Sequence, residues 1–198
     1  MTGPGENTDR LIFFSDGVFA IIITVLVLEL RPPHEASFEA LMALWPSAVA
    51  YAVSYLFLAI VWMNHHHLMR FASQATDRLA WTNFGHLFSV SIVPFATAWV
   101  ADSHLAGLAV AFYAFVFSLV NLTYMALCME AVDKQGADAI SGAARRFMRL
   151  RSIITCVVFA AAVGVAFAYP VGGIVLIVAC LILYARPGSA QNHHPIGS

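Results

Sequence analysis

The ionisable and hydroxyl side chains of the first apolar run are the residues of this sequence best suited to chemistry. Residues 10–30 include Arg10, Ser15, Asp16 and Thr24. A carboxylate within an apolar span is costly unless it faces water or a polar partner, so Asp16 indicates a functional site. The alternative is structural, because the dipole at a helix start and a donor on a neighbouring helix would also stabilise the carboxylate. Both interpretations predict that hydrogen bonds hold Asp16.

The histidines give weak support for metal or cofactor chemistry. His65, His66 and His67 are consecutive, and consecutive helical residues point about 100° apart, so the three cannot share one ion without distortion. We interpret them as the polar end of a helix at the cytoplasmic interface. His86 lies well inside an apolar run and is expected to be a hydrogen-bonded core residue, and the sequence offers no convincing second histidine for a haem. We predict neither a metal nor a cofactor.

The elements that position these residues are membrane-spanning helices. The chain is 61% hydrophobic and 11% charged, with a mean hydropathy of +0.79, which is far more apolar than a soluble domain. Long apolar runs predict an all-α, polytopic membrane protein with six transmembrane helices. The expected spans are 10–30, 43–64, 79–101, 105–129, 148–168 and a short one at 171–185. Pro94 should kink the third span, and Tyr169-Pro170 should separate the last two.

The basic residues predict the topology. Of the ten Lys and Arg, all but Arg31 fall on the side of the two termini, so both termini should be cytoplasmic. The expected organisation is a cytoplasmic N-terminus (1–9), a six-helix transmembrane domain (10–186) and a disordered cytoplasmic tail (187–198). The net charge of −1 gives no reason to expect nucleic acid.

Four arginines at the start of the fifth span allow two interpretations. Arg145, Arg146, Arg149 and Arg151 could bind anionic lipid head groups, or they could serve only to fix the topology. Topology is the favoured interpretation.

Helical geometry gathers six residues of the first span into one stripe. At 100° per residue, a stripe about 100° wide contains Phe14, Gly17, Ile21, Thr24, Val25 and Leu28. Such a stripe is usually ordinary packing, but in a symmetric oligomer it could line a central pathway and gate it by steric constriction and dewetting. Spacing alone leaves both possibilities open.

Several segments of the chain resemble a known family. Arg10-x-x-x-Phe14-Ser15-Asp16-Gly17, with Thr24 and Leu28-Glu29-Leu30 after it, is similar to the first-helix signature of the transmembrane-protein-175 family of potassium channels. The similarity is to the bacterial branch, whose chains contain one six-helix unit. Later segments that resemble the same family are Trp62-x-Asn64-His65-His66, Trp81-x-Asn83 and Pro94-Phe95.

The resemblance implies a homotetramer in the bacterial inner membrane, with a potassium-permeable pore lined by the first helix of each subunit. The chain has no TVGYG-like filter loop. The implied constriction is formed by Ile21, Val25 and Leu28 with Thr24, and because Val25 is smaller than the expected Leu, the narrowest ring should be at Ile21 or Leu28. The residues expected to support the pore helix are Arg10, Phe14, Ser15, Asp16 and Gly17, with Trp81, Asn83 and His86 as partners.

Three classes of function follow, and a passive channel for monovalent cations is favoured. A secondary transporter would need inverted repeats, broken helices and midplane carboxylates, none of which is evident, although a repeat of three plus three spans could be hidden. An intramembrane enzyme is ranked last, because Ser15 and Asp16 are adjacent on a helix and this is poor geometry for a nucleophile and its base.

Overall fold

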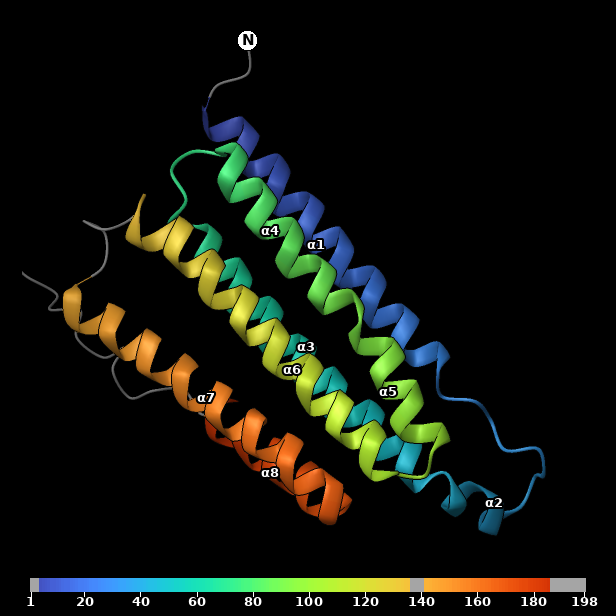
Figure 1. Ribbon diagram of the computed structural model, residues 1–198. Coiled ribbons are helices and arrows are strands. Elements are labelled where there is room, and N and C mark those ends of the chain that lie inside the picture. Colours follow the sequence, from blue (N-terminus) through green and yellow to red (C-terminus); the bar gives the residue numbers. More distant parts are fainter. Residues whose placement is uncertain (1–3, 136–140, 186–198) are drawn as a thin grey trace, which may run out of the picture.

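The chain folds as an elongated bundle of helices. The computed structural model describes residues 4–135 and 141–185 (Figure 1). Within these ranges every regular element is helical, and the predicted all-α membrane fold is confirmed. The helices are α1 (Pro4–Leu28), α2 (Phe38–Ala43), α3 (Trp45–Met69), α4 (Asp77–Ser91), α5 (Val93–Asp102), α6 (Gly107–Cys128), the π-helix η1 (Met129–Asp133), α7 (Gly142–Ala168) and α8 (Pro170–Ala185). The predicted tail at 187–198 lies outside the described residues.

The helices correspond to the six expected spans. Five are long and apolar enough to cross a membrane, namely Asn7–Leu28, Trp45–Met69, Asp77–Asp102, Gly107–Asp133 and Gly142–Ala168. The sixth, Pro170–Tyr184, is shorter, as the sequence predicted. Two helices begin six residues earlier than expected, α1 at Pro4 instead of residue 10 and α7 at Gly142 instead of residue 148. Polar residues there extend the helices beyond the apolar run, and at α7 the Ser141 side chain accepts a hydrogen bond from Ala144 N.

Prolines interrupt the bundle where the sequence places them. Pro94 has no N–H, and the third span breaks into α4, which ends at Ser91, and α5, which begins at Val93. The predicted kink is therefore confirmed. Pro170 likewise starts α8 immediately after α7, while Pro46 sits in the first turn of α3, where a missing N–H costs little.

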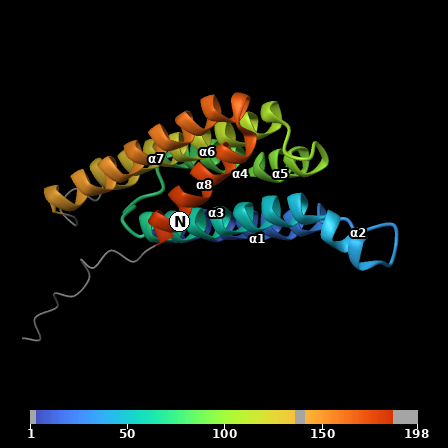
Figure 2. The ribbon, with the colours of Figure 1, turned by 90° about the horizontal axis from the view of Figure 1, so that it is seen from below.

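The first and the seventh helices lie on opposite sides of the bundle. α1 packs against α3, α4 and α5, whereas α7 packs against α6 and α8 (Figure 2). The start of α1 and the end of α8 lie at the same end of the bundle, as an even number of crossings requires (Figure 2). The core between the two sides is apolar and aromatic, with the Phe57 and Phe117 rings stacked at a centroid distance of 3.7 Å.

Candidate functional site

One side of α1 is packed tightly into the bundle. Its buried positions recur every three or four residues, which is the spacing of one helix face. Ser15 and Leu26 are fully buried, and Phe19 is 1% exposed. The remaining members of this packed face are Thr8, Leu11 and Ile22. α1 is therefore fixed in rotation by its contacts with α3, α4 and α5.

The opposite side of α1 is bare in the single chain. The exposed fractions are 64% for Ile21, 38% for Val25 and 75% for Leu28. Thr24 is exposed as well, and its hydroxyl donates to Ile21 O at 2.8 Å. These residues, with Phe14 and Gly17, are the stripe that the sequence predicts, and we call them the uncovered stripe. The uncovered stripe is apolar except for one hydroxyl group, and it carries no charge.

Asp16 is held by helix α3. Trp62 Nε1 donates to Asp16 Oδ1 at 2.9 Å, and His66 Nδ1 lies 3.8 Å from Asp16 Oδ2. The partners named from the sequence for this part of α1 were Trp81, Asn83 and His86, all on α4; Asn83 does bond to the neighbouring Ser15, whereas α3 is the helix that holds Asp16. Trp62 and His66 are four residues apart, hence on one helix face, and this spacing is the signal that sequence reasoning missed.

A chain of buried polar side chains joins α1 to α3 and α4. Asn83 Nδ2 donates to Ser15 Oγ at 2.9 Å, and Asn83 Oδ1 lies 2.7 Å from His65 Nε2. Ser15 Oγ in turn donates to Leu11 O at 2.8 Å. All three linked side chains have no exposed surface. A buried amide with both ends satisfied fixes the relative position of the three helices, because any shift would leave polar groups unpaired.

The network continues from His65 to the middle of the bundle. The His65 and His86 rings stack nearly parallel, 6° apart in plane with centroids at 5.8 Å, and His86 Nδ1 lies 3.1 Å from Thr123 Oγ1 of α6. The three histidines were predicted to form a polar helix end, and His66 and His67 do lie in the last turn of α3, but His65 is fully buried. We call Ser15, Asn83, His65, His86 and Thr123 the anchor network.

The remaining predicted residues lie apart from Asp16. Arg10 is exposed near the start of α1. Trp81 is 75% exposed and contacts Phe84, whose ring also meets the edge of Phe14 at 5.7 Å. Among the described residues, no group of three or more His, Cys, Asp or Glu could hold a metal ion.

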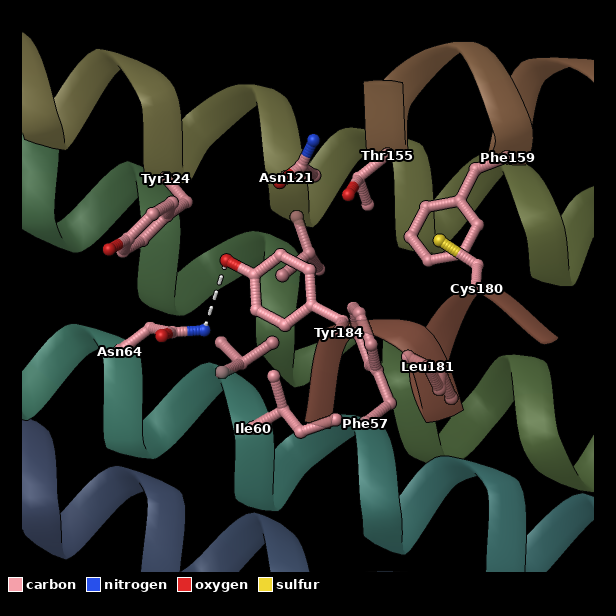
Figure 3. Close-up of a pocket in the computed structure, with 12 residues that line it drawn as sticks. Phe57, Ile60, Asn64, Asn121, Tyr124, Thr155, Phe159, Cys180, Leu181 and Tyr184 are labelled. Carbon is pink, nitrogen blue, oxygen red and sulfur yellow. Dashed lines mark hydrogen bonds between the residues drawn. The ribbon is translucent and has the colours of Figure 1, made fainter. Parts of the chain in front are cut away.

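A small cavity lies on the far side of α3, between α3, α6, α7 and α8 (Figure 3). Its volume is about 30 Å³, room for water molecules only. Asn64 Nδ2 donates to Tyr184 OH at 3.3 Å across it, and Phe57 and Phe159 line its apolar part (Figure 3). The cavity belongs to the packing of α8 on α3.

Fold and site together define a multi-pass helical membrane protein whose first helix is anchored on one side and bare on the other. A family model described as "Endosomal/lysosomal potassium channel TMEM175" matches residues 10–94, the segment that holds the uncovered stripe and most of the anchor network. The chain belongs to the TMEM175 family.

Relatives and a solved structure agree along most of the chain. A potassium channel from Chryseobacterium sp. is 33% identical over 81% of this chain and 83% of its own length. A potassium channel from Streptomyces collinus is 34% identical over 82% of this chain and 84% of its own length. The crystal structure of a lysosomal potassium-selective channel TMEM175 homolog from Chamaesiphon minutus matches with a TM-score of 0.77 at 28% identity, covering 90% of this chain and 96% of that one. These relatives are named as channels and not as enzymes.

Proposed function

We propose that this chain is one subunit of a potassium-permeable cation channel in which four copies surround a pore lined by α1. The names of the bacterial relatives support potassium as the permeant ion. The observation that carries the position of the pore is the uncovered stripe, since Ile21 and Leu28 are 64% and 75% exposed on a helix whose opposite side is fully packed.

The anchor network argues against the simplest rival, an α1 that faces only lipid. A lipid-facing surface tolerates rotation of the helix, because one apolar side chain serves as well as another. Here Ser15 and Asp16 are bonded to two other helices, which holds α1 at one rotation. A fixed rotation is required when one residue must meet its three copies from the other subunits at a symmetry axis.

In the proposed assembly Ile21 and Leu28 form apolar rings that narrow the pathway and gate it by dewetting. Val25 forms a wider ring between them, and Thr24 supplies hydroxyl oxygens to an ion that has lost part of its water. Arg10, Phe14, Gly17 and the anchor network support the helix and do not bind the ion. Both termini face the cytoplasm, and the bacterial inner membrane surrounds the tetramer with lipid.

The test is cation flux through the purified protein in liposomes, first with a potassium gradient and then with a sodium gradient. Ile21→Asn should change the rate or the ion preference of a rapid, downhill, uncoupled flux. Val27→Asn is the matched control, because Val27 is also exposed on α1, at 45%, but lies outside the uncovered stripe. Flux that requires a second coupled ion would instead favour a secondary transporter. If the flux of the Ile21 variant is identical to that of wild type, α1 does not line the pore.

A further inference from the structure

A second pocket lies at the end of the bundle where α1 begins, far from the uncovered stripe. Its volume is about 180 Å³, and it lies between the last turn of α6, η1 and the first half of α7. Three methionines, Met125, Met129 and Met148, line its apolar part. Unbranched, polarisable methionines adapt to ligands of irregular shape. Its volume exceeds the roughly 150 Å³ of an engineered cavity that takes up benzene, so the pocket can admit a small ligand.

The charged part of the pocket is built by one carboxylate and two guanidinium groups. Arg149 Nη2 lies 2.5 Å from Asp133 Oδ2, and Arg145 Nη1 lies 3.9 Å from Asp133 Oδ1. One carboxylate cannot neutralise two guanidinium groups, so the cluster keeps a net positive charge. Each guanidinium has five N–H donors in a planar fork, and Asp133 occupies only some of them. Donors therefore remain available for an anion.

The polarity of the pocket runs along the helix axis. The charged groups meet at one end of the pocket, because Arg145 lies in the first turn of α7 and the Arg149 guanidinium reaches Asp133 at the end of η1, whereas Met125 of α6 lies about two turns further into the span. Outside the pocket, α7 shows apolar side chains to its surroundings, with Phe147 63% exposed. A ligand with an anionic head at the membrane surface and an apolar tail directed into the bilayer matches this order.

We propose that this pocket binds the phosphate head group of an anionic phospholipid, with the upper part of its acyl chain against the three methionines. α7 lies on the side of the bundle opposite α1. If α1 lines a central pore, the pocket therefore faces lipid, and only this orientation rests on the proposed function. Arg145 and Arg149 then bind the lipid phosphate, in addition to any part they play in fixing the topology.

The test measures lipid binding to the purified full chain in detergent, with no flux readout, so its failure is distinct from a failure of the channel proposal. Phosphatidylglycerol and phosphatidylcholine are titrated separately, and bound lipid is counted by native mass spectrometry. Wild type should prefer phosphatidylglycerol by about tenfold, given two partly neutralised arginines at the surface. Arg145→Gln combined with Arg149→Gln should abolish most of this preference. Arg70→Gln, which removes the charge of an exposed arginine that does not line the pocket, should keep it.

Two further arms separate the pocket from general electrostatic attraction. Met148→Trp fills the apolar part and leaves every charge in place, so it should weaken phosphatidylglycerol binding, and it remains informative if the double arginine variant fails to fold. Inorganic phosphate alone should not displace the lipid at equal concentration. An unchanged preference in the double variant, unchanged phosphatidylglycerol binding in Met148→Trp, or full displacement by inorganic phosphate would overturn the proposal.

Discussion

The two faces of α1 differ in how much of their surface the single chain covers. The packed face carries Ser15 and Phe19 in full contact with neighbouring helices, and the uncovered stripe carries Ile21 and Leu28 with most of their surface bare. Both faces are mainly apolar, so hydropathy does not distinguish them. A single subunit therefore buries only one side of its first helix, which is the pattern expected of a helix whose other side packs against further copies.

The largest expected effect comes from breaking the packed face. Phe19→Ala removes a side chain that is 1% exposed, and large-to-small changes of this kind cost roughly 3 to 5 kcal/mol. The matched control is Phe13→Ala, because Phe13 lies on the same helix and is 73% exposed. Thermal unfolding in detergent, followed by intrinsic fluorescence, should show a large drop in melting temperature for Phe19→Ala alone. Equal losses in the two variants would mean that α1 does not have two distinct faces.

Sequence alone was sufficient for the spans and for the stripe. Both depend on local signals: an apolar run of about 20 residues predicts a membrane-spanning helix, and the proline at position 94 predicts a break within one. The stripe followed from 100° per residue, which places Ile21 and Leu28 on one side of the helix; that this side is exposed is known only from the structure.

The partners of the polar residues were harder to predict, because they depend on how helices pack sideways. The spacing of Trp62 and His66 puts both on one face of α3, but spacing does not say that this face meets Asp16. The burial of His65 was missed for a related reason, since a run of three histidines suggests a helix end, whereas the helix continues to Met69. Asn83 was named as a partner, but its bonds to Ser15 and His65 required the structure.

An intermediate effect is expected from the anchor network. Asn83→Leu keeps the side-chain size but leaves Ser15 without its donor and His65 without its partner, and a substitution that leaves buried polar groups unpaired costs roughly 1 to 3 kcal/mol. The melting temperature should fall, by less than for Phe19→Ala. Ion flux per assembled protein should also change, because α1 is no longer held at one rotation.

The control for Asn83 is Thr82→Val on the same helix. The Thr82 hydroxyl donates only to Arg78 O one turn earlier, in an exposed position, so its removal should leave stability and flux nearly unchanged. If Asn83→Leu behaves like Thr82→Val, the network does not position the first helix, and the fixed rotation of α1 must come from apolar packing alone.

The smallest effect on stability, and the sharpest test of the comparison, is expected at the uncovered stripe. Leu28→Cys changes a side chain that is 75% exposed, and substitutions at exposed sites usually alter stability by no more than about 0.5 kcal/mol. If the stripe lines the pore, a positively charged thiosulfonate reagent attached to this cysteine should reduce flux by about half or more, since charge in an apolar constriction opposes cations.

Val27→Cys is the matched variant, because Val27 is one residue away and 45% exposed, yet outside the stripe. Wild type must be treated in parallel, since the described residues include three free cysteines, Cys128, Cys156 and Cys180. Inhibition of Leu28→Cys alone assigns the bare face to the pathway. Equal inhibition of both variants, or of neither, would mean that the bare face meets lipid or another helix, and the asymmetry of α1 would then reflect assembly without permeation.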